Sequence, residues 1–223
     1  MDKNSLRLFA RTAAATKSIN AAHSEILQSL LSLSNLKKQA QAITFAITSK
    51  SAVFPHINET TIENNVFARC LPLTLKVIVS NIQAITVLIK TEQVTQLQKE
   101  VSLLRTIAKE AASFVNRDHA VQSYYAVPVE KDVNVIFPRI IDTAANIDTI
   151  AGMYDRECTL LSFLVANLQI SLGTGKTEDG SDFNRDGNVE VDDVIERWRT
   201  LELVDLVFEG SIMEIAKAAA SAD

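Results

Sequence analysis

Glycine, proline, histidine and cysteine are all scarce in this sequence of 223 residues. It holds 6 Gly and 4 Pro, whereas these two residue types together make up roughly 12% of an average protein. Folds joined by many tight turns need such residues, so sandwiches, barrels and turn-rich α/β folds are disfavoured. The 3 His and 2 Cys are too few for a histidine-rich metal enzyme or a disulfide scaffold.

The chain also lacks a strong charge of one sign and a clear targeting segment. A net charge of −5 gives no reason to expect nucleic acid as a partner. The N-terminal residues lack the apolar run of a secretory signal. Leu71–Ile89 is long enough to span a bilayer, yet Lys76, Asn81 and Gln83 are costly at bilayer depth. We expect a central helix buried on most sides, with conditional contact with a membrane or a partner as the alternative.

Helical periodicity is the dominant feature that the sequence does contain. Apolar residues at steps of three and four predict a helix over residues 4–49. A second helical region is expected to begin near Thr60, which forms a capping box with Glu63. Pro72 is expected to kink or restart it, because proline lacks the backbone N–H that a helix interior uses. This region is expected to end near residues 116–119.

The apolar stripe of the second region shifts at one point. Ile89 and Val94 are five residues apart, whereas the steps on either side are three or four. Two interpretations follow: one long helix with a drifted stripe, or two helices that meet near residues 90–91. The spacing alone leaves both open.

The C-terminal half of the chain predicts further helices. A heptad-like stripe over residues 140–172 includes Tyr154 and Cys158, which we therefore expect in the core. An amphipathic helix is expected over about 191–207, and an alanine-rich one after Gly210. Helices of ~30–45 residues would be ~45–65 Å long and must bury their stripes on one another. The fold class is therefore all-α, an elongated antiparallel bundle of three or four long helices.

Charge divides the chain. Residues 178–209 contain eleven acidic and three basic residues, a net charge of −8, whereas residues 1–177 are mildly basic. We place a domain boundary here: 1–172 is expected to form the long-helix bundle, and 173–223 a module of calcium loop, helix and alanine-rich tail.

The acidic segment contains the one motif that carries chemistry. Oxygen-bearing side chains recur within residues 182–193 at the spacing of a calcium loop, with Gly187 where the chain must turn sharply. Val189 is the apolar residue expected to anchor the loop to the core. The expected Ca²⁺ ligands are Asp182, Asn184, Asp186, Asn188 through its carbonyl, Glu190 through a water, and Asp193.

This segment resembles an EF-hand loop, and more specifically the loop of dockerin repeats, in which position 12 is Asp. A dockerin has two such repeats and this chain has one, so the cohesin-binding role does not carry over. One unpaired loop favours a structural Ca²⁺ ion over a regulatory switch. The alternative is an acidic Asx-turn loop that binds no metal.

Other apparent motifs point away from catalysis. Gly173–Thr177 ends like a phosphate-binding loop, but Ile170 stands where that motif requires glycine. His23, His56 and His119 fall in three separate regions, where we expect surface or capping roles. We therefore expect a non-enzymatic protein without a small-molecule substrate.

Three functional interpretations follow. The first is a structural or assembly subunit that self-associates through its long helices and is stabilised by one calcium ion. A virion or extracellular assembly would suit it better than the cytoplasm. The second is a calcium-dependent adaptor that binds a protein partner. The third is a membrane-acting helical protein, similar in outline to pore-forming toxins, for which Leu71–Ile89 is the only support.

Overall fold

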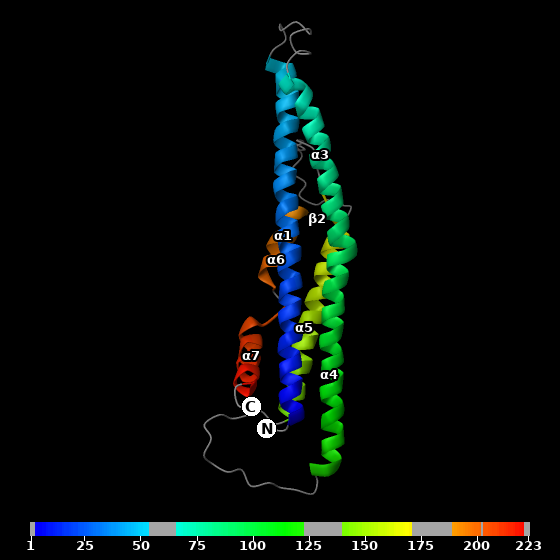
Figure 1. Ribbon diagram of the computed structural model, residues 1–223, viewed down its shortest axis with the longest axis vertical. Coiled ribbons are helices and arrows are strands. Elements are labelled where there is room, and N and C mark those ends of the chain that lie inside the picture. Colours follow the sequence, from blue (N-terminus) through cyan, green and yellow to red (C-terminus); the bar gives the residue numbers. More distant parts are fainter. Residues whose placement is uncertain (1–2, 54–65, 123–139, 171–188, 202, 221–223) are drawn as a thin grey trace, which may run out of the picture. The chain divides into compact units, whose positions relative to one another are not determined.

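The computed structural model describes residues 3–53, 66–122, 140–170, 189–201 and 203–220. Within these ranges the chain is almost entirely helical, which confirms the all-α prediction (Figure 1). The helices are α1 (Lys3–Val53), α3 (Val66–Leu88), α4 (Val94–Gln122), α5 (Ile140–Ala166), α6 (Val191–Thr200) and α7 (Leu206–Ala220), with a π-helix, η1 (Ile89–Gln93), between α3 and α4. Two-residue strands β1 (Leu168–Gln169) and β2 (Val189–Glu190) pair in parallel.

The described chain forms two compact units, each built from separate segments. Unit 1 comprises residues 1–23, 95–161 and 201–223, and unit 2 comprises residues 24–94 and 162–200. In each unit α1 runs antiparallel to the α3–α4 helix (Figure 1). The predicted boundary between 172 and 173 lies outside the described residues and stays a prediction.

The core of unit 1 is the predicted apolar stripe. It contains Phe9 and Ile19 of α1, Leu104 of α4 and Ile147 of α5, each no more than 2% exposed. Cys158 and Tyr154 are buried as well, as the heptad spacing predicts. The recurrence of apolar residues every three or four positions thus determines which side chains face inward.

The core of unit 2 includes Ile26, Leu30 and Leu33 of α1, none of which is exposed. The α6 helix adds Trp198, also fully buried. Acidic residues in the first turn of α6 and basic residues in its last turn complement the helix dipole.

The five-residue step has a structural cause. Residues 66–122 form one continuous helix through η1, so the expected alternative of two helices that meet near residues 90–91 is wrong, and the expected drift of the stripe is absent as well. The backbone N–H of Val94 donates to the carbonyl of Ile89, which is the separation of a π-helix. One extra residue is accommodated here, and Ile89 and Val94 therefore lie on the same buried face. Pro72 lies inside α3.

Two predicted helix ends are wrong. The α5 helix ends at Ala166 rather than at residue 172. Lys90 Nζ donates to the carbonyls of Ala166 and Leu168, at 3.2 and 3.1 Å, and so caps this end. Leu168 is nonetheless buried, within β1.

The last amphipathic segment, expected over 191–207, forms two helices. Leu201 has a left-handed backbone with a φ of 43°, which ends α6. The carboxylate of Asp205 then accepts hydrogen bonds from the N–H groups of Val207 and Phe208 at 3.0 and 2.9 Å. Asp205 is therefore the N-cap of α7. An aspartate directly before an apolar run is a signal for a helix start that the sequence contains, but the predicted helix over 191–207 did not take it into account.

Candidate interaction surface

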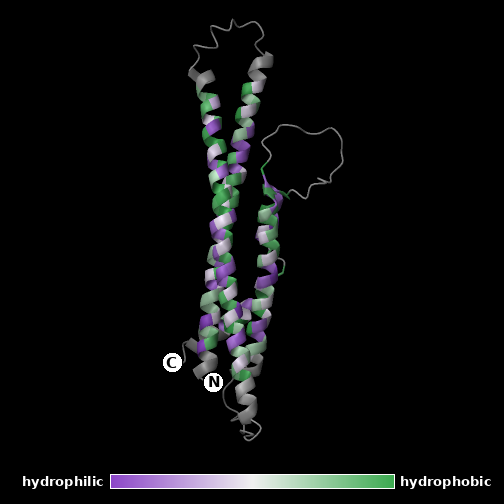
Figure 2. Ribbon diagram, turned by 90° about the vertical axis from the view of Figure 1, so that its right-hand side faces the viewer, coloured by the Kyte–Doolittle hydropathy of each residue, from purple (hydrophilic) through white to green (hydrophobic). Residues whose placement is uncertain are grey.

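The exposed face of α3 is the most unusual surface of unit 2. Figure 2 shows that hydrophobic residues recur along the helices, with hydrophilic residues between them. On α3 the apolar residues occupy two faces. Ile78, Ile82 and Ile89 lie inward and are at most 7% exposed. Leu73, Val77 and Val87 lie outward and are 64%, 59% and 59% exposed.

This outward face follows a regular spacing of its own. Successive steps of four and three residues connect exposed residues from Leu73 of α3 to Thr91 of η1. Such a 3.5-residue period places side chains along one straight seam of a helix. We call this seam the α3 face; it consists of Leu73, Val77, Ser80, Ala84, Val87 and Thr91, with Leu88 at its edge.

Polar residues border the α3 face. Lys76 and Gln83 lie one position before seam residues, and Thr74 and Asn81 one position after, and all four are exposed. An apolar centre with a polar border is the arrangement of protein interfaces. A helix surrounded by lipid would instead be apolar on all sides.

The expectation that Leu71–Ile89 is buried on most sides is wrong. Among the described residues one helix, Cys70–Val115, is long and apolar enough to cross a membrane, and 17% of its apolar 18-residue window is buried. Exposed apolar patches of this kind mark surfaces for protein or membrane contact. The predicted burial was based on the inward stripe alone, although the sequence also contains the spacing of the outward one.

Only two of the six expected calcium ligands, Glu190 and Asp193, lie within the described residues; Asp182, Asn184, Asp186 and Asn188 lie outside them. Glu190 pairs with Lys37 Nζ at 2.6 Å, and Asp193 is exposed. In the described ranges no cluster of three His, Cys, Asp or Glu side chains could hold a metal ion. The calcium site therefore stays a prediction.

The end of the expected loop is fixed within unit 2. The N–H of Val189 donates to the carbonyl of Asn167 at 3.2 Å, and Val189 pairs with Leu168 in the two-stranded sheet. Ser34 Oγ donates to the carboxylate of Asp192 at 2.6 Å. Together with the Lys37 ion pair, these contacts hold the start of α6 beside α1.

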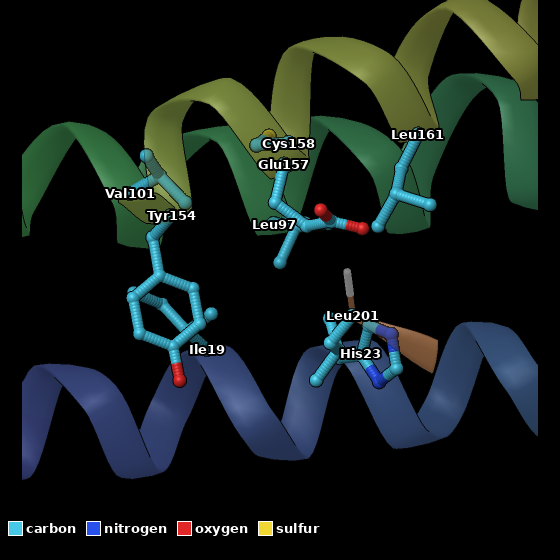
Figure 3. A pocket seen from close by; sticks show the side chains of 9 residues that line it. All are labelled: Ile19, His23, Leu97, Val101, Tyr154, Glu157, Cys158, Leu161 and Leu201. Atoms are coloured by element: carbon cyan, nitrogen blue, oxygen red, sulfur yellow. The ribbon is translucent and has the colours of Figure 1, made fainter. Parts of the chain in front are cut away.

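A small pocket in unit 1 is lined by polar as well as apolar side chains. Figure 3 shows the carboxylate of Glu157 on α5 and the ring of His23 on α1 pointing into it. Its volume is about 10 Å³, the size of about one water molecule. His23, expected at the surface or as a cap, is half-buried and lines this pocket; His56 and His119 lie outside the described side chains.

In unit 1, two buried carboxylates form hydrogen bonds that hold the segment around α7 in place. Glu157, 1% exposed, accepts the N–H of Leu203 at 3.1 Å. Glu209, 7% exposed, accepts from the Asn20 amide at 3.2 Å. The Tyr154 hydroxyl donates to Asn20 Oδ1 at 3.0 Å. Burial, together with the adjacent Glu209 charge, raises the pKa of Tyr154 far above its usual value, so the phenol stays protonated. This network is suited to holding the segment in place.

Comparisons with known proteins yield no family: no protein-family model, no curated protein and no solved structure matches the chain.

Proposed function

We propose that this chain is a non-enzymatic structural subunit that self-associates through its long helices and is stabilised by one bound calcium ion. The observation that carries the proposal is the α3 face. It presents Leu73, Val77 and Val87 to solvent at more than half exposure, on the side of the helix opposite its buried stripe. Exposed apolar side chains that gather on one helix face mark surfaces for protein contact.

The remaining surface of unit 2 supports the same proposal. Phe45 of α1 and Phe163 of α5 are 65% and 62% exposed. Aromatic side chains are enriched at protein interfaces because they bury a large area with few rotatable bonds. An assembly built from many such contacts gains avidity although each contact is weak.

Mass measurement by light scattering tests the self-association. We expect the wild-type mass to rise above 24.5 kDa with protein concentration. Val77→Glu should keep the mass at that of the monomer, because a carboxylate would be buried without a partner. Gln39→Glu makes the same charge change at an exposed position of α1 and should behave as wild type. A wild-type monomer at every concentration would contradict the proposal.

The calcium part rests on the spacing of residues 182–193 and is tested separately. At a calcium concentration 100 times the dissociation constant, binding adds about 2.7 kcal/mol of stability. For a chain of this size that raises the melting temperature by roughly 5–10 °C. Asp182→Ala and Asp186→Ala should each remove the rise, whereas Glu196→Ala, an exposed acid of α6, should keep it. Equal melting of the wild type in calcium and in chelator would disprove the site.

A further inference from the structure

We infer that the α3 face binds the α3 face of a second copy, antiparallel, with the two-fold axis at Ile82. This inference rests on the proposed function and specifies its contact. The starting observation is that the spacing of the seam is symmetric about Ile82, with like residues at the two inner of its three pairs. Val77 and Val87 stand five residues on either side, Ser80 and Ala84 two, and Leu73 and Thr91 nine.

A two-fold axis at Ile82 would bring residues from the two copies together in pairs. A residue before the axis meets the residue equally far beyond it on the other copy, so Val77 meets Val87 and Ser80 meets Ala84. An isologous interface requires this kind of self-complementary surface. The small side chains lie next to the axis, where they let the two backbones approach closely. The larger Leu73, Val77 and Val87 lie further out and fill the wider gaps.

The charge of Lys76 favours the antiparallel direction of pairing. Lys76 is the one charged side chain between Cys70 and Ile89, and it is exposed at the border of the face. In a parallel pair the two copies of Lys76 stand at the same level, separated mainly by the interhelical distance of about 8–10 Å. In the antiparallel pair they are twelve residues apart along the axis, about 18 Å. That is about twice the Debye length of about 8 Å at physiological salt, so the repulsion between the two lysines is weaker in the antiparallel pair than in the parallel one.

The area buried between the two α3 faces indicates how tightly the two copies bind. From Leu73 to Thr91 the helix is about 28 Å long, and two strips about 10 Å wide bury roughly 600 Å². Stable protein interfaces bury about 1,200–2,000 Å² in total, and transient ones less. The pair is therefore weak. We expect it to form at high protein concentration or within a larger assembly.

Disulfide trapping tests the register in the full chain. With Cys70→Ser as background, a 1:1 mixture of Ser80→Cys and Ala84→Cys should give a covalent dimer on mild oxidation. Each variant alone should give at most a tenth of that yield. A disulfide needs Cα atoms within about 7 Å, which the antiparallel register allows only for unlike positions. Unchanged circular dichroism melting of both variants shows that the fold is intact.

The possible results of this experiment distinguish a failure of the antiparallel pairing from a failure of the proposed self-association. A covalent dimer of the unlike pair supports both. A dimer of Ser80→Cys with itself indicates parallel pairing and overturns the inference alone, as does association by light scattering without any disulfide. Monomers throughout overturn both. A blue shift of a fluorophore on Val77→Cys with phosphatidylcholine–phosphatidylserine vesicles, but not at high protein concentration, would identify lipid as the occupant and overturn the inference.

Discussion

Deletion of Thr91 should leave the protein folded, whereas deletion of Gln98 from the same long helix should abolish its cooperative unfolding. Thr91 lies within η1, and Gln98 lies in the regular α4 helix that follows. Both residues are exposed, so neither deletion removes a core side chain. The different effects of the two deletions on stability must therefore come from the rotation of the following residues about the helix axis.

Removing Thr91 changes the separation of Ile89 and Val94 from five residues to four. Four is the hydrogen-bond separation of an α-helix, so the π-helix becomes regular while the buried faces on both sides stay aligned. The expected change in the free energy of unfolding is within about 1 kcal/mol of wild type.

Removing Gln98 rotates every later residue by about 100° relative to the earlier ones. Val101, Leu104 and Ala108, now at most 4% exposed, would leave the core of unit 1. Burial of each large apolar side chain contributes about 1.5–3 kcal/mol, and total stability is about 5–15 kcal/mol. Urea unfolding followed by circular dichroism measures both variants. Equal destabilisation by the two deletions would show that η1 does not hold an extra residue.

Trp198→Ala should lower the free energy of unfolding by about 3–5 kcal/mol, because it leaves a large cavity in unit 2. The Trp198 side chain is fully buried, and Val191, Val194 and Ile195 are buried on the same short helix. The α6 helix has 10 residues, too few to be stable without packing, since isolated helices shorter than about 12–15 residues are marginal in water. The tryptophan is therefore its main anchor.

Urea unfolding by circular dichroism measures this cost, with Arg199→Ala as the matched control. Arg199 is exposed on the same helix and should cost less than about 0.5 kcal/mol. In the wild type the one tryptophan of the sequence gives an independent fluorescence signal of the same transition. A loss below about 1 kcal/mol for Trp198→Ala would mean that α6 contributes little to unit 2.

The sequence by itself determined the helices and their inward faces. Steps of three and four residues placed Tyr154 and Cys158 in the core correctly, because the period of a helix determines which side chains share a face. The step from Ile89 to Val94 coincides with η1, but the spacing alone predicted no π-helix and did not distinguish a shifted helix from two helices. The spacing of residues 182–193 gave the calcium prediction, which the described residues leave untested.

Only the tertiary structure decided which apolar faces are covered. Ile82 and Val87 look alike in the sequence, yet one is 5% and the other 59% exposed. That difference depends on which helices lie beside α3, and periodicity along one helix does not contain this information. The same holds for His23 and Glu157, which come from distant parts of the chain and meet at one cavity only because α1 and α5 pack together in unit 1.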